Sequence, residues 1–216
     1  ITNDPNASAV VTGNADFTAL AIVLGNQAGD LFQFGSLTFH STGAVEIYED
    51  DSTLLSGASS AATLILESTG AIANDSTADL AVVGNANFKG ASIDLGGQAG
   101  DAMRFGSLTF NSTGDVSIVE DDATLLVGAS TAANLVLESL GALTNDPAAR
   151  LDVAGNADLT GASIALGAKA GDAMRFGSLT FHSTGAVAIS EDDDTLLVDV
   201  STAKSLALRS AGALTN

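Results

Sequence analysis

The chain lacks cysteine and tryptophan, and it is poor in proline, aromatic residues and basic residues. Its 216 residues include one Tyr, two Pro and only 7 Lys and Arg, against 26 Asp and Glu. Without Cys, neither a disulfide nor a thiolate metal site can form. A net charge of −19 leaves no clustered cations to bind nucleic acid or an anionic membrane. No apolar run approaches the roughly 18 residues of a membrane-spanning helix.

What the chain does contain is one 71-residue unit in three copies. The segment Phe34-Gly35-Ser36-Leu37-Thr38-Phe39 returns at residues 105–110 and again at 176–181, with no insertion or deletion in the register. The chain has no initiator Met, no signal peptide and no atypical capping repeat. We therefore expect one continuous body over residues 1–216 that is an internal piece of a longer array. The copies are residues 1–71, 72–142 and 143–213, and residues 214–216 begin a fourth.

Each copy carries three phrases in which apolar residues alternate with small or polar ones and a Gly-containing turn follows. In the second copy they start at Leu80, Leu108 and Leu135. This period of two is typical of strands with one buried face, and helix signals are weak. One phrase cannot bury its apolar face alone, but stacked phrases can. We predict an all-β protein, a right-handed parallel β-helix (β-solenoid) with about three coils per 71-residue copy. A string of small β-domains is the alternative.

The spacing of the phrases predicts unequal coils. The steps from Leu80 to Leu108 and from Leu108 to Leu135 are long, whereas the step from Leu135 to Leu151, where the next copy takes up the first phrase, is short. This indicates either two long coils and one short coil in each copy, or phrases that do not mark the starts of the coils. At about 4.8 Å per coil, nine coils would span about 43 Å. A constant period also predicts that copy-equivalent residues point the same way. Two such series are Phe34, Phe105 and Phe176, and Leu37, Leu108 and Leu179.

Acidic clusters recur in all three copies and are the first candidates for chemistry. One interpretation is calcium, a hard cation that takes several carboxylate and carbonyl oxygens. The other is a solvated turn, in which Asp hydrogen-bonds to the local backbone. The calcium-binding β-roll pattern is absent and the clusters lie a full copy apart, so we favour the turn and assign no metal ligand. The clusters are Glu49-Asp50-Asp51, Glu120-Asp121-Asp122 and Glu191-Asp192-Asp193-Asp194.

An Ala-Gly-Asp turn also recurs, and in two copies an Arg follows the Asp by three residues. These are Arg104 and Arg175, whereas the first copy has Gln33. Because one copy dispenses with the Arg, we expect a loop salt bridge and not a functional acid–base pair. The Asp residues of the turn are Asp30, Asp101 and Asp172.

Histidine and threonine offer two weaker candidates. His40 and His182 share one position, where the second copy has Asn111. They have no Cys, second His or activated nucleophile nearby in the sequence, so we expect exposed strand-end residues and no catalysis. A recurring Thr suggests a flat ice- or mineral-binding array, but it occurs once per copy without a Thr-x-Thr pattern, so we set this idea aside. The Thr residues are Thr38, Thr109 and Thr180.

Two phrases resemble the repeats of very large bacterial exported proteins. They are Phe-Gly-Ser-Leu-Thr-Phe-x-Ser-Thr-Gly-x-Val, as at residues 105–116, and Leu-Glu-Ser-x-Gly-Ala, as at residues 137–142. Such phrases are similar to those of filamentous-haemagglutinin-like and autotransporter-like adhesins with β-helical repeat regions. The resemblance implies secretion, a fibrous stalk and an adhesive or matrix role, and it brings no catalytic or ligand-binding residues.

These observations favour a structural repeat segment of a long extracellular or cell-surface fibre, adhesive or matrix-forming, over an enzyme. A catalytic site in a β-helix is a unique cluster, whereas every candidate group here has copies at 71-residue steps. We expect no cofactor, and as partners other copies of the same protein, end to end or side by side, or a surface or glycan. A calcium-dependent binding module and a polysaccharide-active β-helix remain the alternatives.

Overall fold

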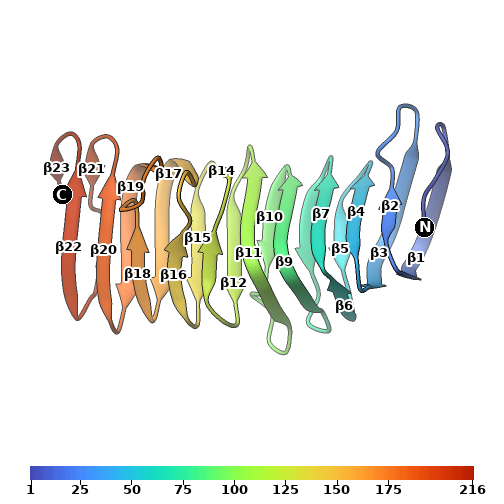
Figure 1. Ribbon diagram of the computed structural model, residues 1–216, viewed down its shortest axis with the longest axis horizontal. Coiled ribbons are helices and arrows are strands. Elements are labelled where there is room, and N and C mark those ends of the chain that lie inside the picture. The colour runs from blue at the N-terminus through green and yellow to red at the C-terminus, as the bar shows by residue number, and fades with distance from the viewer. The chain divides into compact units, whose positions relative to one another are not determined.

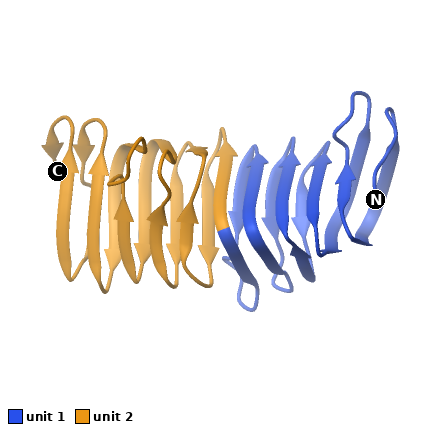
Figure 2. Ribbon diagram, in the orientation of Figure 1, with its two compact units in different colours: residues 1–106 blue, residues 107–216 orange.

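The structure, a computed structural model, describes residues 1–216. It is all-β, without a helix. In it, 21 parallel strands stack as a β-solenoid of about nine turns, and two further short strands near the C-terminus pair with each other (Figure 1). This confirms the predicted fold class and the estimate of about three coils per copy. The chain divides into two compact units, Ile1–Gly106 and Ser107–Asn216, which are described separately (Figure 2).

Unit 1 contains ten strands and the first part of an eleventh, β11. In these strands, alternate residues are buried, as in β7, where Leu64 and Leu66 point inward. The strands are β1 (Ser8–Ala19), β2 (Ile22–Leu24), β3 (Leu31–Ser41), β4 (Ala44–Glu49), β5 (Thr53–Leu55), β6 (Ala58–Ala61), β7 (Thr63–Ser68), β8 (Ala71–Asn74), β9 (Asp79–Gly90), β10 (Ser92–Leu95) and β11 (Ala102–Ser112).

Unit 2 contains the rest of β11 and twelve further strands, again separated by turns rich in Gly, Asn, Asp and Ser, the residues that favour tight turns. They are β12 (Val116–Glu120), β13 (Thr124–Leu126), β14 (Ala129–Ala132), β15 (Leu135–Ser139), β16 (Ala142–Asn145), β17 (Arg150–Gly161), β18 (Ser163–Leu166), β19 (Ala173–Ser183), β20 (Ala186–Glu191), β21 (Thr195–Leu196), β22 (Ser205–Ser210) and β23 (Leu214–Thr215).

Three sides make one turn of the solenoid. In unit 1, β4 pairs with β7, β5 with β8, and β6 with the first half of β9. The second half of β9 then pairs with β7, where Leu64 meets Ala86. The long strand β9 therefore covers two sides of the solenoid.

The register corrects the predicted coil lengths. Residues that pair across adjacent coils are separated by similar lengths of chain throughout. The pairs Ile22 with Val45 and Ala44 with Thr63 show this in unit 1, and Leu108 with Leu126 shows it in unit 2. The coils are thus nearly even, and the prediction of two long coils and one short coil was wrong. Two of the three phrases lie within long strands that each cover two sides, so a phrase does not mark the start of a coil.

The register also corrects the predicted stacking of copy-equivalent residues. Ile22 starts a column that runs through Val45 and Leu64 to Ala86, three turns later. Three turns of the solenoid contain slightly fewer residues than one copy. The remaining residues of the copy lead the chain onto the next side of the solenoid. Ile93, the equivalent of Ile22, accordingly lies on the next side, in the column of Thr53 and Ile72.

Unit 2 repeats this advance. Val116 begins a column that continues through Leu135, Ala157 and Leu179, each paired with the one before. Val187, its equivalent in the next copy, pairs with Ile164 on another side. Within each unit, equivalent residues of successive copies therefore occupy successive sides of the solenoid.

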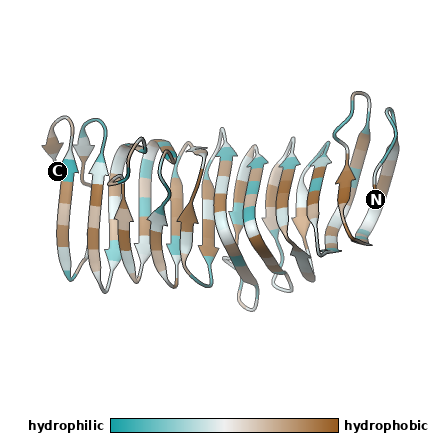
Figure 3. Ribbon diagram, in the orientation of Figure 1, coloured by the Kyte–Doolittle hydropathy of each residue, from teal (hydrophilic) through white to brown (hydrophobic).

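Within each unit, the core is a stack of apolar side chains enclosed by the sides of the solenoid. Brown and pale residues alternate along most strands, as a buried inner face and a polar outer face require (Figure 3). Phe34, Phe105 and Phe176 are each only 3% exposed, so the predicted series does point inward although its members do not stack. Phe34 meets Phe17 edge to face, with ring centroids 5.5 Å apart, a favourable geometry for aromatic pairs.

Candidate functional site

The acidic clusters begin at the ends of equivalent strands, where the chain turns from one side of the solenoid to the next. The first residue of each cluster is the last residue of β4, β12 or β20 and points into the core. These glutamates are Glu49, Glu120 and Glu191, exposed by 3%, 0% and 3%. The Asp residues that follow are outside the core. We call each such turn, with its Glu, an acidic corner.

Each buried glutamate lies against a threonine four residues later in the chain. The hydroxyl of Thr53 donates to Oε2 of Glu49 at 2.5 Å. The equivalent distances are 2.6 Å from Thr124 to Glu120 and 2.6 Å from Thr195 to Glu191. All three Thr residues are buried. The pattern Glu-x-x-x-Thr is visible in every copy, and it could have identified these partners from the sequence.

The acidic corner also holds the backbone of the preceding coil. The amide of Phe34 donates to Oε1 of Glu49 at 2.8 Å, and the amide of Phe32 donates to Oδ2 of Asp50 at 2.8 Å. In the third copy, Glu191 and Asp192 accept from the amides of Phe176 and Met174 at 2.9 and 2.8 Å. Carboxylates thus satisfy backbone donors that are buried or part-buried, and buried donors are costly to leave unpaired.

The third residue of the cluster closes the corner through its carbonyl. The Asp122 carbonyl accepts from the Ser139 hydroxyl at 2.7 Å and from the amide of Gly141 at 2.7 Å. Asp51 and Asp193 are bonded in the same way by Ser68 with Gly70 and by Ser210 with Gly212. The clusters therefore form hydrogen-bonded turns, as the sequence interpretation favoured.

Burial shifts the titration of the corner glutamates. Desolvation, together with the neighbouring Asp51 carboxylate, raises the pKa of Glu49 to about 7, although the bonds from Thr53 and Phe34 oppose the shift. Burial likewise raises the pKa of Glu191, with Asp193 in the place of Asp51. A carboxyl group without a cation partner in a poorly solvated site favours its neutral form.

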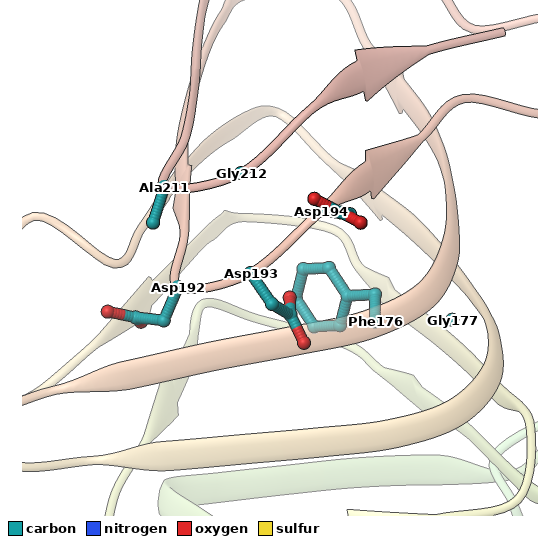
Figure 4. A pocket seen from close by; sticks show the side chains of 7 residues that line it. All are labelled: Phe176, Gly177, Asp192, Asp193, Asp194, Ala211 and Gly212. Atoms are coloured by element: carbon teal, nitrogen blue, oxygen red, sulfur yellow. The ribbon is translucent and has the colours of Figure 1, made fainter.

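The third-copy corner lines a surface hollow of about 470 Å³ in unit 2. Asp193 and Asp194 project beside the ring of Phe176, and Gly177, Asp192, Ala211 and Gly212 complete the lining (Figure 4). Asp194 also accepts from the amide of Ala213 at 2.7 Å. The structure brings together no group of three or more His, Cys, Asp or Glu side chains that could hold a metal ion.

The Ala-Gly-Asp turns bind asparagine and not arginine. Asp101 accepts from the Asn74 side chain at 2.7 Å and from the Gln98 amide at 2.9 Å. Arg104 instead pairs with Asp79 of the preceding coil at 3.0 Å. The predicted salt bridge between Asp101 and Arg104 was therefore wrong, because the coil register sets a different acid beside the arginine. Asp30 and Asp172 hold Asn3 and Asn145 in the same way, at 2.7 and 2.9 Å.

His182 lies between two polar side chains of neighbouring coils. Its Nε2 is 3.8 Å from Oδ1 of Asp158, and its Nδ1 is 3.5 Å from the hydroxyl of Thr202. Sequence reasoning missed this alignment because the three residues come from three different coils. The distances exceed the 2.6–3.2 Å of proton transfer, although such contacts are often loose in a free protein. The side chains of His182 and Asp158 are 41% and 36% exposed.

The recurring Thr residues do not form a surface array. Thr38, Thr109 and Thr180 are only 7%, 8% and 3% exposed. Each donates its hydroxyl to a backbone carbonyl of the next coil, at 2.6, 2.9 and 3.1 Å. They bind the coils to one another, and they cannot present the flat hydroxyl surface that ice or a mineral would require.

Comparison of the chain with known protein families, curated proteins and solved structures finds no match. The structure contains no helix of the length and hydrophobicity that a membrane span requires.

Proposed function

We propose that the chain is a structural segment of a long extracellular or cell-surface fibre, adhesive or matrix-forming, and not an enzyme. The observation that carries this proposal is the acidic corner, which recurs in the copies with the same internal bonds. The polar groups that repeat most regularly hold adjacent coils together. Groups that repeat in this way favour a long, regular solenoid over a single catalytic site.

The proposal extends to origin and partners. The phrases at 105–116 and 137–142 resemble those of filamentous-haemagglutinin-like and autotransporter-like adhesins, and a parallel β-solenoid is the fold expected of their repeat regions. We propose other copies of the same protein as partners, end to end or side by side, because an open strand edge pairs readily with another strand. A surface or glycan is the proposed target of an adhesive fibre.

Small-angle X-ray scattering on the chain in solution tests the structural proposal. The expected profile is that of an elongated particle, since each coil adds about 4.8 Å along the stacking direction. Sedimentation over a range of protein concentrations tests association, and the mass should rise with concentration. A compact, near-spherical profile with a constant monomer mass would contradict the proposal.

One alternative is a calcium-dependent binding module at the acidic hollow, although its carboxylates do not converge into a group that could hold a metal ion. Three consecutive carboxylates, Asp192 to Asp194, line a space of about 470 Å³, and calcium prefers carboxylate oxygens. Binding to the folded state would raise the melting temperature in calcium relative to chelator. Asp193→Asn should abolish that difference and Asp115→Asn, at an exposed site elsewhere, should keep it. An unchanged melting temperature would count against the module.

A further inference from the structure

The six glutamates of the chain fall into two equal sets. Three are the buried residues of the acidic corners, at equivalent positions of the three copies. The other three lie outside the core on β4, β7 and β15. The buried set is Glu49, Glu120 and Glu191, and the outer set is Glu46, Glu67 and Glu138.

The charged groups around Glu49 supply no free cation. Asp50 and Asp51 belong to its own corner, and Glu67 and Tyr48 face the hollow beside it. Lys89 lines the same hollow, but its ammonium lies 2.8 Å from the Glu67 carboxylate. The charge nearest to Glu49 is therefore negative, and it disfavours a second negative charge there.

The corner of Glu191 has the same character. Asp192 and Asp193 share its turn, and on β22 it is Ser210 that pairs with it. Arg209 pairs instead with Ser190, whose side chain lies on the opposite face of the strand. Glu120 is fully buried against Thr124 at 2.6 Å, with Asp121 and Asp122 in its turn and Glu138 beside Val119.

The threonine partner suits a carboxyl group in either protonation state. A hydroxyl can donate to a carboxylate oxygen, and it can equally accept the proton of a carboxylic acid. The 2.5–2.6 Å contacts to Thr53, Thr124 and Thr195 therefore survive protonation. An isolated buried carboxylate is costly, and the usual outcome is a neutral acid.

We propose that the three buried glutamates are proton-binding sites that couple the folding of this protein to pH, so that the fold is most stable in mildly acidic solution. The proton lies on Oε2, the carboxyl oxygen beside the Thr hydroxyl. The Thr hydroxyl or the neighbouring Asp carboxylate then accepts the hydrogen bond from the protonated glutamate.

The direction of the effect follows from linkage. The pKa of Glu49 is raised from 4.5 to about 7, so the folded protein binds this proton more tightly than the unfolded chain. The stabilisation is complete below about pH 4.5, and it is lost as the pH rises through about 7. The raised pKa of Glu191 acts in the same direction, whereas the lowered pKa of exposed Asp75 opposes it.

Urea unfolding between pH 4.5 and 8 tests the proposal with two triple variants of equal charge. One replaces the buried set by Gln. The other replaces three exposed carboxylates away from the acidic corners, Asp16, Asp94 and Asp152, by Asn. For the natural chain, the unfolding equilibrium constant should increase with pH, by about 100-fold from Glu49 alone. The exposed-Asp variant should keep this slope and the buried-set variant should lose most of it. Equal slopes in both variants would overturn the proposal, because general charge repulsion would then explain the pH dependence.

An infrared measurement tests the same sites without requiring the variants to fold. The natural protein at pH 6 should show the carbonyl absorption of a protonated carboxylic acid, which a solvated glutamate has lost at that pH. The absorption should disappear as the pH is raised past about 8. A folded natural protein without this absorption at pH 6 would refute the proposal.

Discussion

At the scale of single residues, the copies differ most clearly at the turn that follows the buried asparagine. In the first and third copies Asp is followed by Pro, and the next residue has a positive φ, 62° at Asn6 and 63° at Ala148. The amides of Ala7 and Ala149 donate to the carbonyls of Asp4 and Asp146, which closes a four-residue turn. Asn adopts this left-handed conformation at a lower free-energy cost than Ala.

Ala148→Asn should therefore stabilise the protein by about 0.5–1 kcal/mol, because the left-handed conformation costs an L-residue about 1–2 kcal/mol and Asn less. The reverse change, Asn6→Ala, should destabilise it by a similar amount. Urea midpoints at constant slope measure both effects. A gain at residue 148 without a loss at residue 6 would show that φ is not the cause.

The buried polar residues mark the limit of sequence reasoning at this scale. The apolar alternation predicts which side chains enter the core, because a strand has a period of two. It does not predict that Glu49 enters with them, since a carboxylate in a turn is normally solvated. The Asn74–Asp101 bond depends on the coil register, which the 71-residue period alone does not reveal. The Glu49–Thr53 bond, in contrast, joins residues four apart in one turn, and the sequence pattern contains it.

At the scale of elements, the long strands turn a corner without ending. β1 and β3 pair over their whole length, and the register shifts between Val11 and Asn14, opposite Gly35. A side chain added at Gly35 would lie 2.3 Å from the carbonyl oxygen of Thr12. The close approach of two backbones at this corner therefore requires glycine.

Gly35→Ala should destabilise the protein by about 1–3 kcal/mol, the usual effect of forcing extra atoms into a packed site. Gly13→Ala is the matched control, because an added side chain there meets nothing within 4 Å. Chemical denaturation of the two variants gives the comparison. Similar losses for both would mean that backbone flexibility, and not the close approach, decides the result.

The long strands also explain why the coil lengths were predicted wrongly. Turn residues were used to divide each copy into coils, yet β9 and β11 each contain a Gly, at 84 and 106, within a continuous strand. The strands themselves were recognisable from their alternation. The sides that each strand covers were not recognisable, because Gly occurs both where a strand bends and where a strand ends.

At the scale of the whole molecule, charge dominates. The net charge is −19 at pH 7, because 26 acidic residues face 7 basic ones, and two of the basic residues form the ion pairs Lys89–Glu67 and Arg104–Asp79. Both pairs are exposed and contribute little. Most of the acidic charge is therefore uncompensated, and it repels itself in the folded state.

Sodium chloride should accordingly raise the melting temperature between about 10 mM and 500 mM, because the screening length falls from roughly 30 Å to a few ångströms. Potassium chloride should act equally, since screening does not depend on the identity of the cation. Calorimetric scans at pH 8, above the raised pKa of Glu49, measure the effect. A melting temperature independent of salt would show that the acidic residues lie too far apart to interact.

Because equivalent residues advance by one side per copy, inward and outward positions of the copies are constrained differently. Most core positions are apolar on each side of the solenoid, so the copies can keep similar inward residues. An outer strip, in contrast, is assembled from non-equivalent residues, as in the run Tyr48, Glu67 and Lys89. A change introduced identically in all copies would therefore be distributed around the axis. A continuous binding strip along one side would need different sequence positions in each copy. Its residues should therefore be sought where the copies differ.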